Sequence, residues 1–318
     1  MIWEKLGKIF DPTSHAMPIG CVEYAQSPQA LMLDNVVRIY FSTRSKDVNN
    51  KYLSHIAFVD FSKDLRNVIN VSSKPVIELG KLGTFDEHGI FPISPVRLDN
   101  KIVAYTCGWS RRVSVPVETS IGLAISHDNG QSFEKIGEGP IMGSSLHEPF
   151  LVGDAFVRLY DGHHHMWYIY GTLWTAFPGE RAPDRVYKIG HAISQDGLSW
   201  QREGKQIIPD KLNEDECQAL PSVVHFNDQY HMVFCYRHAT RFRTESSRSY
   251  RIGYAFSSDL TAWTRNDDLV RLDTSPGHWD SDMMCYPHLF ECNSKLYLLY
   301  NGNEFGRFGF GLAVLDGK

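Results

Sequence analysis

One short pattern recurs along this chain and limits its fold more than any other feature. The opening stretch WEKLGKIFDP (Trp3 to Pro12) resembles WQREGKQIIP (Trp200 to Pro209). The second copy lies inside a longer unit, YKIGHAISQDGLSWQREGKQIIP, which reads as a strand, a tight turn at Asp196-Gly197 and a second strand. The chain therefore begins part-way through a repeated unit.

Copies of this signature recur at a nearly regular distance. With the aromatic residue after each turn as a marker, Phe133 and Trp200 lie 67 residues apart, and Trp200 and Trp263 lie 63 apart. Such a period indicates a sheet-repeat architecture, and five units fill the chain. The further copies are ISHDNGQSFEKIGEGPIM (Ile125 to Met142), FSSDLTAWTRNDDLVRL (Phe256 to Leu272) and, more weakly, VDFSKDLRNVINVSSKPVIEL (Val59 to Leu79).

The aspartates of these turns, Asp128 and Asp196, are predicted to be structural. Their side chains can accept hydrogen bonds from nearby backbone amides, and Gly130 and Gly197 supply the positive φ that tight turns require. We expect them on the outer rim of the fold.

A second mark precedes each hairpin and completes the unit. A segment ending in Pro is followed by an apolar strand, a short polar turn and a strongly β-prone strand, so each unit is predicted to contain four antiparallel strands. Such a sheet must stack on neighbours to bury both faces. The last unit, ending at Phe308 to Lys318, has only three strands, and Trp3 to Phe10 is predicted to supply the fourth. We predict one all-β domain over residues 1–318, a five-bladed β-propeller of four-stranded antiparallel blades with its ring closed by the N-terminal strand.

Composition narrows the classes of partner. A net charge of −5 and a pI near 6.3 give no electrostatic footprint for nucleic acid. Arg241, Arg243, Arg248 and Arg251 crowd one segment, which is interpreted as a solvated loop in preference to an anion site. Neither a secretory signal nor an apolar stretch of membrane-spanning length is found, so we expect a cytoplasmic protein without membrane contact.

The first strand of every propeller blade lines the central channel, so polar residues of the proline-marked segments are predicted to converge there. Carboxylates gathered in a cleft raise one another's pKa, as a general acid and its ionised neighbour require in glycosidic bond cleavage. Aligned on Pro28, Pro92, Pro149, Pro221 and Pro287, these segments bring in Glu23, Asp86, Glu87, His88, His147, Glu148, Asp215, Glu216, Asp280 and Asp282.

The second strands end in a group suited to sugar binding. Tryptophan faces can stack on sugar rings, whereas arginine and asparagine can hydrogen-bond hydroxyls or an anionic substituent. The alternative for each aromatic residue alone is packing between blades. The predicted substrate-binding residues, from both groups, are Arg44, Glu87, His88, Trp109, His147, Trp174, Arg237, His238, Asp282 and Asn301.

Together these residues resemble the five-bladed propeller glycosidases of glycoside hydrolase families 43, 62, 32, 68 and 130. The resemblance covers the whole chain and includes blade starts such as Asp86 to Pro92, with the form acidic-x-x-Gly-x-x-Pro. His147 to Val152, HEPFLV, is similar to the third-blade motif whose Glu is the proton donor. The resemblance thus implies an enzyme in which Glu148 is the acid and Asp86, or Asp215 with Glu216, is the base or stabiliser.

The chain departs from these families at two positions. The first-blade proline follows Ser27 where families 43 and 32 have a catalytic Asp, and Ser94 stands where family 43 has another. Either one of the other acids substitutes, or the reaction differs, as in the family 130 phosphorylases, where Arg44, Arg111, Arg112 or Arg237 would hold phosphate. The remaining alternative is a carbohydrate-binding propeller without catalysis.

Histidine offers one further expectation. The run His163 to His165 lies between two strands and is interpreted as a solvent-exposed turn. His88, His147 and His288 belong to channel-facing segments, and a central cation near them is the one cofactor that the sequence suggests.

Overall fold

The strands of this protein pair almost entirely with their neighbours in sequence. The computed structural model describes residues 2–18, 20–98, 101–176, 178–179 and 182–315, and these form three sheets of four strands and one of eight. The eight-stranded sheet consists of two groups of four that meet at a single parallel pair, Ser54 with Gly89. Helical segments in the described part are short: η1 (Pro12–Ser14), η2 (Ser246–Arg248), η3 (Asp267–Leu269) and α1 (Asn303–Gly306).

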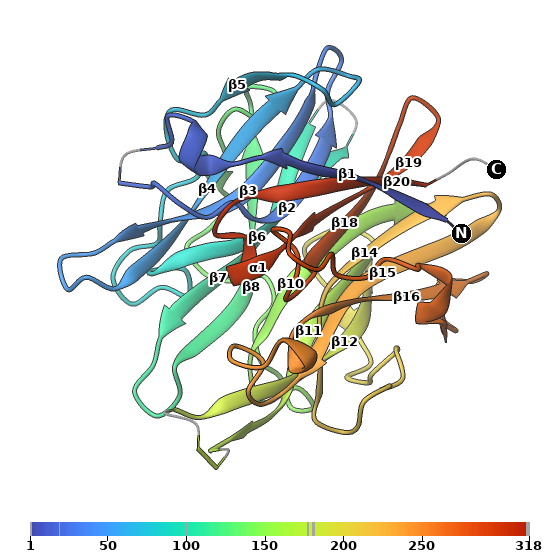
Figure 1. The fold of residues 1–318 in the computed structure, drawn as a ribbon. Helices are drawn as coiled ribbons and strands as arrows, with labels where there is room; N and C mark the ends of the chain where they lie inside the picture. The colour runs from blue at the N-terminus through green and yellow to red at the C-terminus, as the bar shows by residue number, and fades with distance from the viewer. Residues whose placement is uncertain (1, 19, 99–100, 177, 180–181, 316–318) are drawn as a thin grey trace.

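Each group of four runs antiparallel from a first strand to a short or edge fourth strand (Figure 1). The first strands β2, β6, β10, β14 and β18 contact one another in that order, and β18 contacts β2 again. The strands are β1 (Trp3–Phe10), β2 (Gln26–Met32), β3 (Val37–Lys46), β4 (Tyr52–Phe61), β5 (Val68–Val71), β6 (Gly89–Leu98), β7 (Lys101–Arg111), β8 (Val117–Ser126), β9 (Glu134–Lys135), β10 (Val152–Tyr160), β11 (His163–Thr175), β12 (Asp184–Ser194), β13 (Gln201–Arg202), β14 (Glu216–Phe226), β15 (Gln229–His238), β16 (Arg251–Ser257), β17 (Thr264–Arg265), β18 (Cys285–Cys292), β19 (Lys295–Asn301) and β20 (Phe310–Leu315).

The chain's first strand shares a sheet with its last three strands. β1 pairs antiparallel with β20, from Trp3 opposite Leu315 to Phe10 opposite Phe310, and the sheet continues through β19 to β18. Figure 1 shows the blue β1 alongside the red β20. The bounds of β1 agree with the predicted strand, whereas residues 316–318 of the predicted final strand lie outside the described residues.

In four of these groups, an ion pair with a buried acid connects the fourth strand to the start of the first strand. The fourth strands carry a basic residue two positions after an aromatic one, as in Trp200-Gln201-Arg202. In each case it pairs with an acid at or shortly before the first strand of the same group. The pairs are Lys135 with Asp86 (2.5 Å), Arg202 with Glu148 (2.7 Å), Arg265 with Glu216 (2.6 Å) and Lys5 with Asp280 (2.7 Å).

Every first strand contains a bulge at the same place. The register shifts between Gln26 and Gln29, Ile90 and Ile93, Gly153 and Phe156, Ala219 and Ser222, and Cys285 and His288. Proline cannot donate to a strand ladder, so a bulge accommodates it. The bulges hold Pro28, Pro92, Pro221 and Pro287 in four strands and Ala155 in β10.

The third of these positions corrects the alignment made on prolines. Pro149 precedes β10, and the bulge that corresponds to the other four lies six residues later, at Asp154-Ala155. With Ala155 in place, the five positions are separated by 64, 63, 66 and 66 residues. The first residue of the bulge has positive φ in four of the five strands: Ser27, Asp154, Leu220 and Tyr286.

The turn aspartates have the structural role that was predicted. Asp196 accepts hydrogen bonds from the amides of Leu198 and Ser199, both at 2.8 Å, and these bonds lower its pKa to about 2. Asp128 accepts from the amide of Ser132 at 2.9 Å.

Candidate active site

A cavity of about 320 Å³ opens where all five groups of strands meet. Its size suits a small ligand, and aromatic rings and arginines dominate its wall. It is lined by Gln26, Arg44, Tyr52, Ser54, Phe91, Trp109, Val117, Thr119, Arg185, Tyr187, Arg237, Phe242, Arg243, Tyr250, Tyr286 and Phe305. These described lining residues include four arginines and no carboxylate.

A smaller cavity of about 90 Å³ continues from the first one and contains an acid, Asp154. Both cavities share the side chains of Phe91, Thr119, Arg185, Tyr187, Tyr250 and Tyr286. Asp154 is held at the β10 bulge with a φ of 50°, which turns its side chain toward this space, and its Oδ2 accepts from the amide of Leu220 at 3.4 Å.

Burial gives Asp154 an unusual acidity. The residue is 7% exposed, and desolvation of the charged form raises its pKa from 3.8 to about 7. The Leu220 amide and the charge of Arg185 favour the charged form and offset this rise only in part. A carboxyl group with a pKa near neutrality can hold a proton for donation and take it back afterwards.

This pKa shift makes stability depend on pH in a predictable direction. Between pH 3.8 and about 7 the folded protein binds a proton on Asp154 that the unfolded chain releases, so the contribution of Asp154 to stability is complete below pH 4 and falls as pH rises to 7. At ~1.4 kcal/mol per pH unit the loss amounts to up to ~4 kcal/mol. We expect Asp154→Asn to lack this loss, which urea denaturation of both proteins at pH 4.5 and 7.5 measures. Identical pH dependence in the two proteins would contradict the assignment.

Arg237 is the most buried charged group of the larger cavity. It is 2% exposed, and its guanidinium donates to the carbonyls of His238 and Ala239 and to the hydroxyl of Tyr187 at 3.1 Å. The guanidinium also lies over the ring of Phe242, 3.5 Å from the ring centre. Its Nε has no hydrogen-bond partner among the described residues.

Arg44 faces the same cavity from β3. Its guanidinium lies 4.8 Å from the ring centre of Tyr24 and 5.3 Å from that of Tyr52, and its buried Nε also has no partner among the described residues. Arg185 and Arg243, in contrast, share the carboxylate of Asp184 at 3.7 and 3.3 Å.

Of the predicted substrate-binding residues, the structure brings Arg44, Trp109 and Arg237 together in this cavity. His88 lies behind Trp109, with the two rings 5.8 Å apart, and its Nδ1 accepts from the amide of Arg111 at 3.4 Å. Burial, together with the charge of Arg111, lowers the pKa of His88.

The other predicted substrate-binding residues do not line the cavity. His147 and Asp282 are exposed, and His238 is half-buried. Glu87 accepts a hydrogen bond from the amide of Gly83, and Trp174 lies beside Arg185 in a neighbouring groove. Asn301 is buried and forms hydrogen bonds with the backbone of Ala25, Ser27 and Gly309. Arg243 was not predicted to bind substrate, because its segment was interpreted as a solvated loop, but it lines the cavity.

Glu148, predicted to be the proton donor, lies apart from both cavities. Its side chain is fully buried, accepts a hydrogen bond from the hydroxyl of Tyr168, and pairs with Arg202 at 2.7 Å. Burial next to Glu148 raises the pKa of Tyr168. Each carboxylate oxygen of Glu148 therefore faces one partner within its own group of strands.

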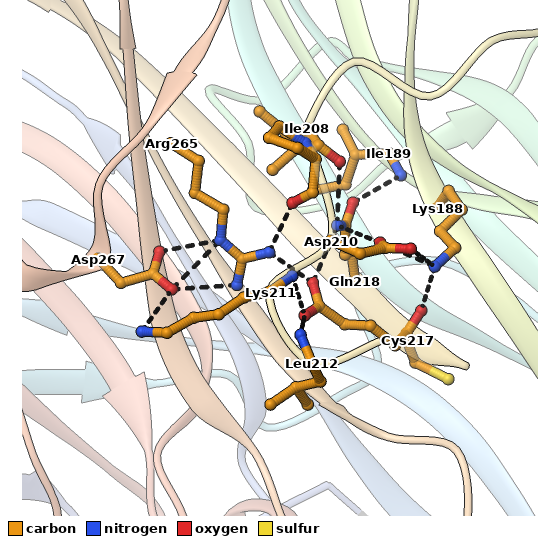
Figure 2. Close-up of polar contacts among 12 residues, drawn as sticks. Lys188, Ile189, Ile208, Asp210, Lys211, Leu212, Cys217, Gln218, Arg265 and Asp267 are labelled. Carbon is orange, nitrogen blue, oxygen red and sulfur yellow. Dashed lines mark hydrogen bonds and ion pairs between the residues drawn. The ribbon is translucent and has the colours of Figure 1, made fainter. Parts of the chain in front are cut away.

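Glu216 is also fully occupied. Its carboxylate accepts four hydrogen bonds, from Arg265 at 2.6 Å, from Gln218 at 3.0 Å and from the amides of Lys211 and Leu212 at 2.9 Å. Figure 2 labels the four donor residues, which come from β14, from β17 and from the loop that precedes β14. A carboxylate with four donors is fixed in place and has no free lone pair for a substrate.

The remaining two predicted catalytic acids are also separate from the cavity. Asp86 is 1% exposed and pairs with Lys135 at 2.5 Å beside a different groove, and Asp215 is exposed to solvent. The structure therefore does not bring Asp86, Glu148, Asp215 and Glu216 together. The expectation that they meet in one channel is corrected, because three of them neutralise basic residues of the fourth strands.

Asp154, Tyr187, Tyr250 and Tyr286 were missed in the sequence. The signal for Asp154 was a lone acid in the apolar stretch LVGDAFV, at the spacing of the other bulges. The hydroxyls of Tyr187 and Tyr250 share one hydrogen bond of 2.7 Å at the cavity wall, a contact between β12 and the residue before β16 that no local pattern indicates.

Neither a metal cluster nor a membrane helix is found in the described part of the chain. No three His, Cys, Asp or Glu residues lie close enough there to hold a metal ion, and His88, His147 and His288 are in different surroundings. His288 is buried among rings, stacked on Phe290 and tilted against Phe156. Among the described residues, no helix has the length and apolar character needed to cross a bilayer.

Comparison with known proteins places the chain in a family. No protein-family model matches it. "Uncharacterized protein Rv1502" and "Uncharacterized protein MT1551", from two strains of Mycobacterium tuberculosis, are each 32% identical to it over 99% of this chain and 100% of their own length. The chain belongs to the same family as these two proteins.

The fold of this chain is similar to the folds of several solved structures. A family-43 glycoside hydrolase described as thermostable aligns with a TM-score of 0.64 at 14% identity, over 96% of this chain and 94% of that one. A β-1,2-mannobiose phosphorylase from Listeria innocua, solved with β-1,2-mannobiose, aligns with a TM-score of 0.68 at 12% identity, over 99% and 97%. The chain therefore shares the overall fold of these two enzymes.

Proposed function

We propose that this protein is an enzyme that cleaves a glycosidic bond in its central cavity, with Asp154 as the proton donor. The observation that carries the proposal is a buried acid with a pKa of about 7 that lines the inner cavity, continuous with an aromatic-walled space of about 320 Å³. The glycoside-active enzymes among the proteins of similar fold support the same class of substrate.

The architecture that supports this proposal is one ring of five blades. The first strands contact one another in a cycle, and β1 joins the sheet of β18 to β20. We take the two halves of the eight-stranded sheet as separate blades, since one residue pair connects them. On this basis residues 1–318 form a single propeller domain whose ring the N-terminal strand closes.

In the proposed reaction, Asp154 protonates the departing glycosidic oxygen as the bond to the anomeric carbon breaks. Burial keeps the proton on Asp154 until that moment. A sugar ring would stack on the aromatic wall, which includes Trp109, Tyr52 and Phe305. The attacking group bonds to the anomeric carbon from the opposite face as the glycosidic bond breaks, so the configuration at that carbon is inverted.

Water and inorganic phosphate are the two candidates for the attacking group. Inverting hydrolysis requires a second carboxylate to activate water, and none is among the described lining residues. Phosphate is already a nucleophile at neutral pH and needs only cations to hold it, and four arginines line the cavity. This arrangement favours phosphorolysis over hydrolysis.

A product screen tests the proposal. Purified protein is incubated with panels of aryl glycosides and oligosaccharides, with and without inorganic phosphate, and products are followed by anomeric proton NMR. Cleavage only with phosphate supports phosphorolysis, and cleavage without phosphate supports hydrolysis. Sugar binding without product from any panel would overturn the proposal and favour a non-catalytic carbohydrate-binding propeller.

A further inference from the structure

We infer that the ligand of the central cavity carries an oxyanion, a phosphate or a carboxylate, that Arg44 and Arg237 bind between them. The sugar part of this ligand rests on the proposed function, whereas the anion is inferred from the arginines themselves. Both side chains line the same cavity, from β3 and β15, and neither forms an ion pair with any described carboxylate.

The burial of Arg237 is the first reason. Removing a guanidinium from water without a counter-ion is unfavourable, and neutral partners offset the cost only in part. Arg237 is 2% exposed and its described partners, the carbonyls of His238 and Ala239 and the Tyr187 hydroxyl, are all neutral. Its Nε is left without a partner, so the site is incomplete until an acceptor occupies the cavity.

The way Arg44 is held is the second reason. Tyr24 and Tyr52 lie 4.8 and 5.3 Å from its guanidinium, which restricts the plane of the group, and it donates no hydrogen bond to a described residue. A pre-oriented guanidinium with all its donors free is suited to forked recognition of a carboxylate or phosphate.

The distribution of charge separates these two arginines from the others. Arg185 and Arg243 already lie near the carboxylate of Asp184. Arg44 and Arg237 are therefore the two lining arginines that form no ion pair with a described carboxylate, and the charge of Asp184 reaches Arg237 without direct contact. Stacking on tyrosine or phenylalanine rings stabilises a cation, but it provides no acceptor for the free N–H groups.

Gln26 adds a neutral group to the wall of the same cavity. Its Nε2 donates to the carbonyl of Phe305 at 2.6 Å, while its Oε1 is buried without a partner among the described residues. This oxygen would accept from a hydroxyl of the sugar that carries the anion.

The anion has two chemical sources that use the same clamp. It is either a phosphate or carboxylate substituent of the sugar, or free inorganic phosphate that attacks the anomeric carbon. In both cases the oxyanion would accept hydrogen bonds from Arg44 and from the Nε of Arg237.

Calorimetric titration of the full chain tests the clamp without requiring turnover. The probes are inorganic phosphate, glucose 6-phosphate, glucuronic acid and neutral glucose, each added to the wild type, to Arg44→Gln and to the exposed-arginine control Arg66→Gln. We expect at least one anionic probe to bind the wild type and Arg66→Gln equally and Arg44→Gln at least ~10-fold more weakly, the loss typical of a charge-assisted hydrogen bond. Binding of phosphate alone identifies free phosphate as the source, and preference for a sugar anion identifies the substituent.

Two results would overturn the inference: equal affinity of Arg44→Gln and Arg66→Gln for every anion, or binding of glucose alone. Arg237→Gln is measured as well, but Arg44→Gln decides the result if the Arg237 variant does not fold. Repeating the titrations on Asp154→Asn separates the two proposals. Anion binding that depends on Arg44 in a protein that cleaves nothing would retain the clamp and reject the proposed function.

Discussion

Replacing Asp154 with asparagine is expected to lower kcat/KM by about 10²- to 10⁴-fold, the range that a general acid contributes. Asparagine has almost the same shape, and it can still accept from the amide of Leu220, so the cavity should be preserved. The kinetics are measured on the substrate that the product screen identifies, and ligand affinity is measured separately by calorimetry. Because the lost group acts only as the bond breaks, we expect affinity to change little while turnover falls.

The same variant has a signature in the pH profile. The reaction needs protonated Asp154, so kcat/KM of the wild type should decline as pH rises through about 7, and this limb should be absent from Asp154→Asn. Asp215→Asn is the matched control, because this acid is exposed and distant from the lining residues. Wild-type activity in Asp154→Asn, or a comparable loss in Asp215→Asn, would remove Asp154 from the proposed mechanism.

Much of the fold could be predicted because short local patterns of residues mark each repeating unit. The turn aspartates and the aromatic residue after each turn were found from sequence, and each depends on neighbours within a few residues. The N-terminal strand was found because it resembles the segment from Trp200 to Pro209, although its partner β20 lies at the other end of the chain. Arg44, Trp109 and Arg237 could be placed at the cavity by the same periodic reasoning, since each lies within two residues of the end of the second strand of its group.

Asp154 was missed for a specific physical reason. The proline at four of the bulges served as the alignment mark, but a bulge only permits proline and does not require it, and β10 has Ala155 instead. Choosing the nearest proline, Pro149, shifted this strand by six residues and brought Glu148 into the apparent channel. The even spacing of the bulges is the better guide, because it reflects the size of a whole unit.

The predicted acids show what sequence periodicity leaves undetermined. An acid near the start of a first strand can point toward the channel or toward the fourth strand of its own group, and spacing along the chain does not separate the two. The partner decides: a basic residue two positions after the turn aromatic, such as Arg202 or Arg265, provides the opposite charge within the group. That basic residue is visible in the sequence, but its significance depends on contacts between strands about 50 residues apart.

Replacing Glu148 with glutamine is the sharpest test of this structural role. The change leaves Arg202, whose side chain is 17% exposed, without its carboxylate, and removing one partner of a buried pair typically costs about 3–5 kcal/mol. We therefore expect Glu148→Gln to lower the free energy of unfolding by roughly 3 kcal/mol, measured by urea denaturation. Glu138→Gln removes the acid of an exposed pair with Lys81 and is expected to change stability by less than ~1 kcal/mol.

The outcome separates two roles for the same residue. A proton donor at position 148 would give a variant of unchanged stability and greatly reduced turnover, as the resemblance to the glycosidase motif implies. An ion pair that joins the first and fourth strands would give a destabilised variant that retains most of its turnover below its unfolding transition. Adding Arg202→Gln to Glu148→Gln should then restore part of the lost stability, because the second change removes the unpaired buried charge, whereas it has no reason to restore lost catalysis.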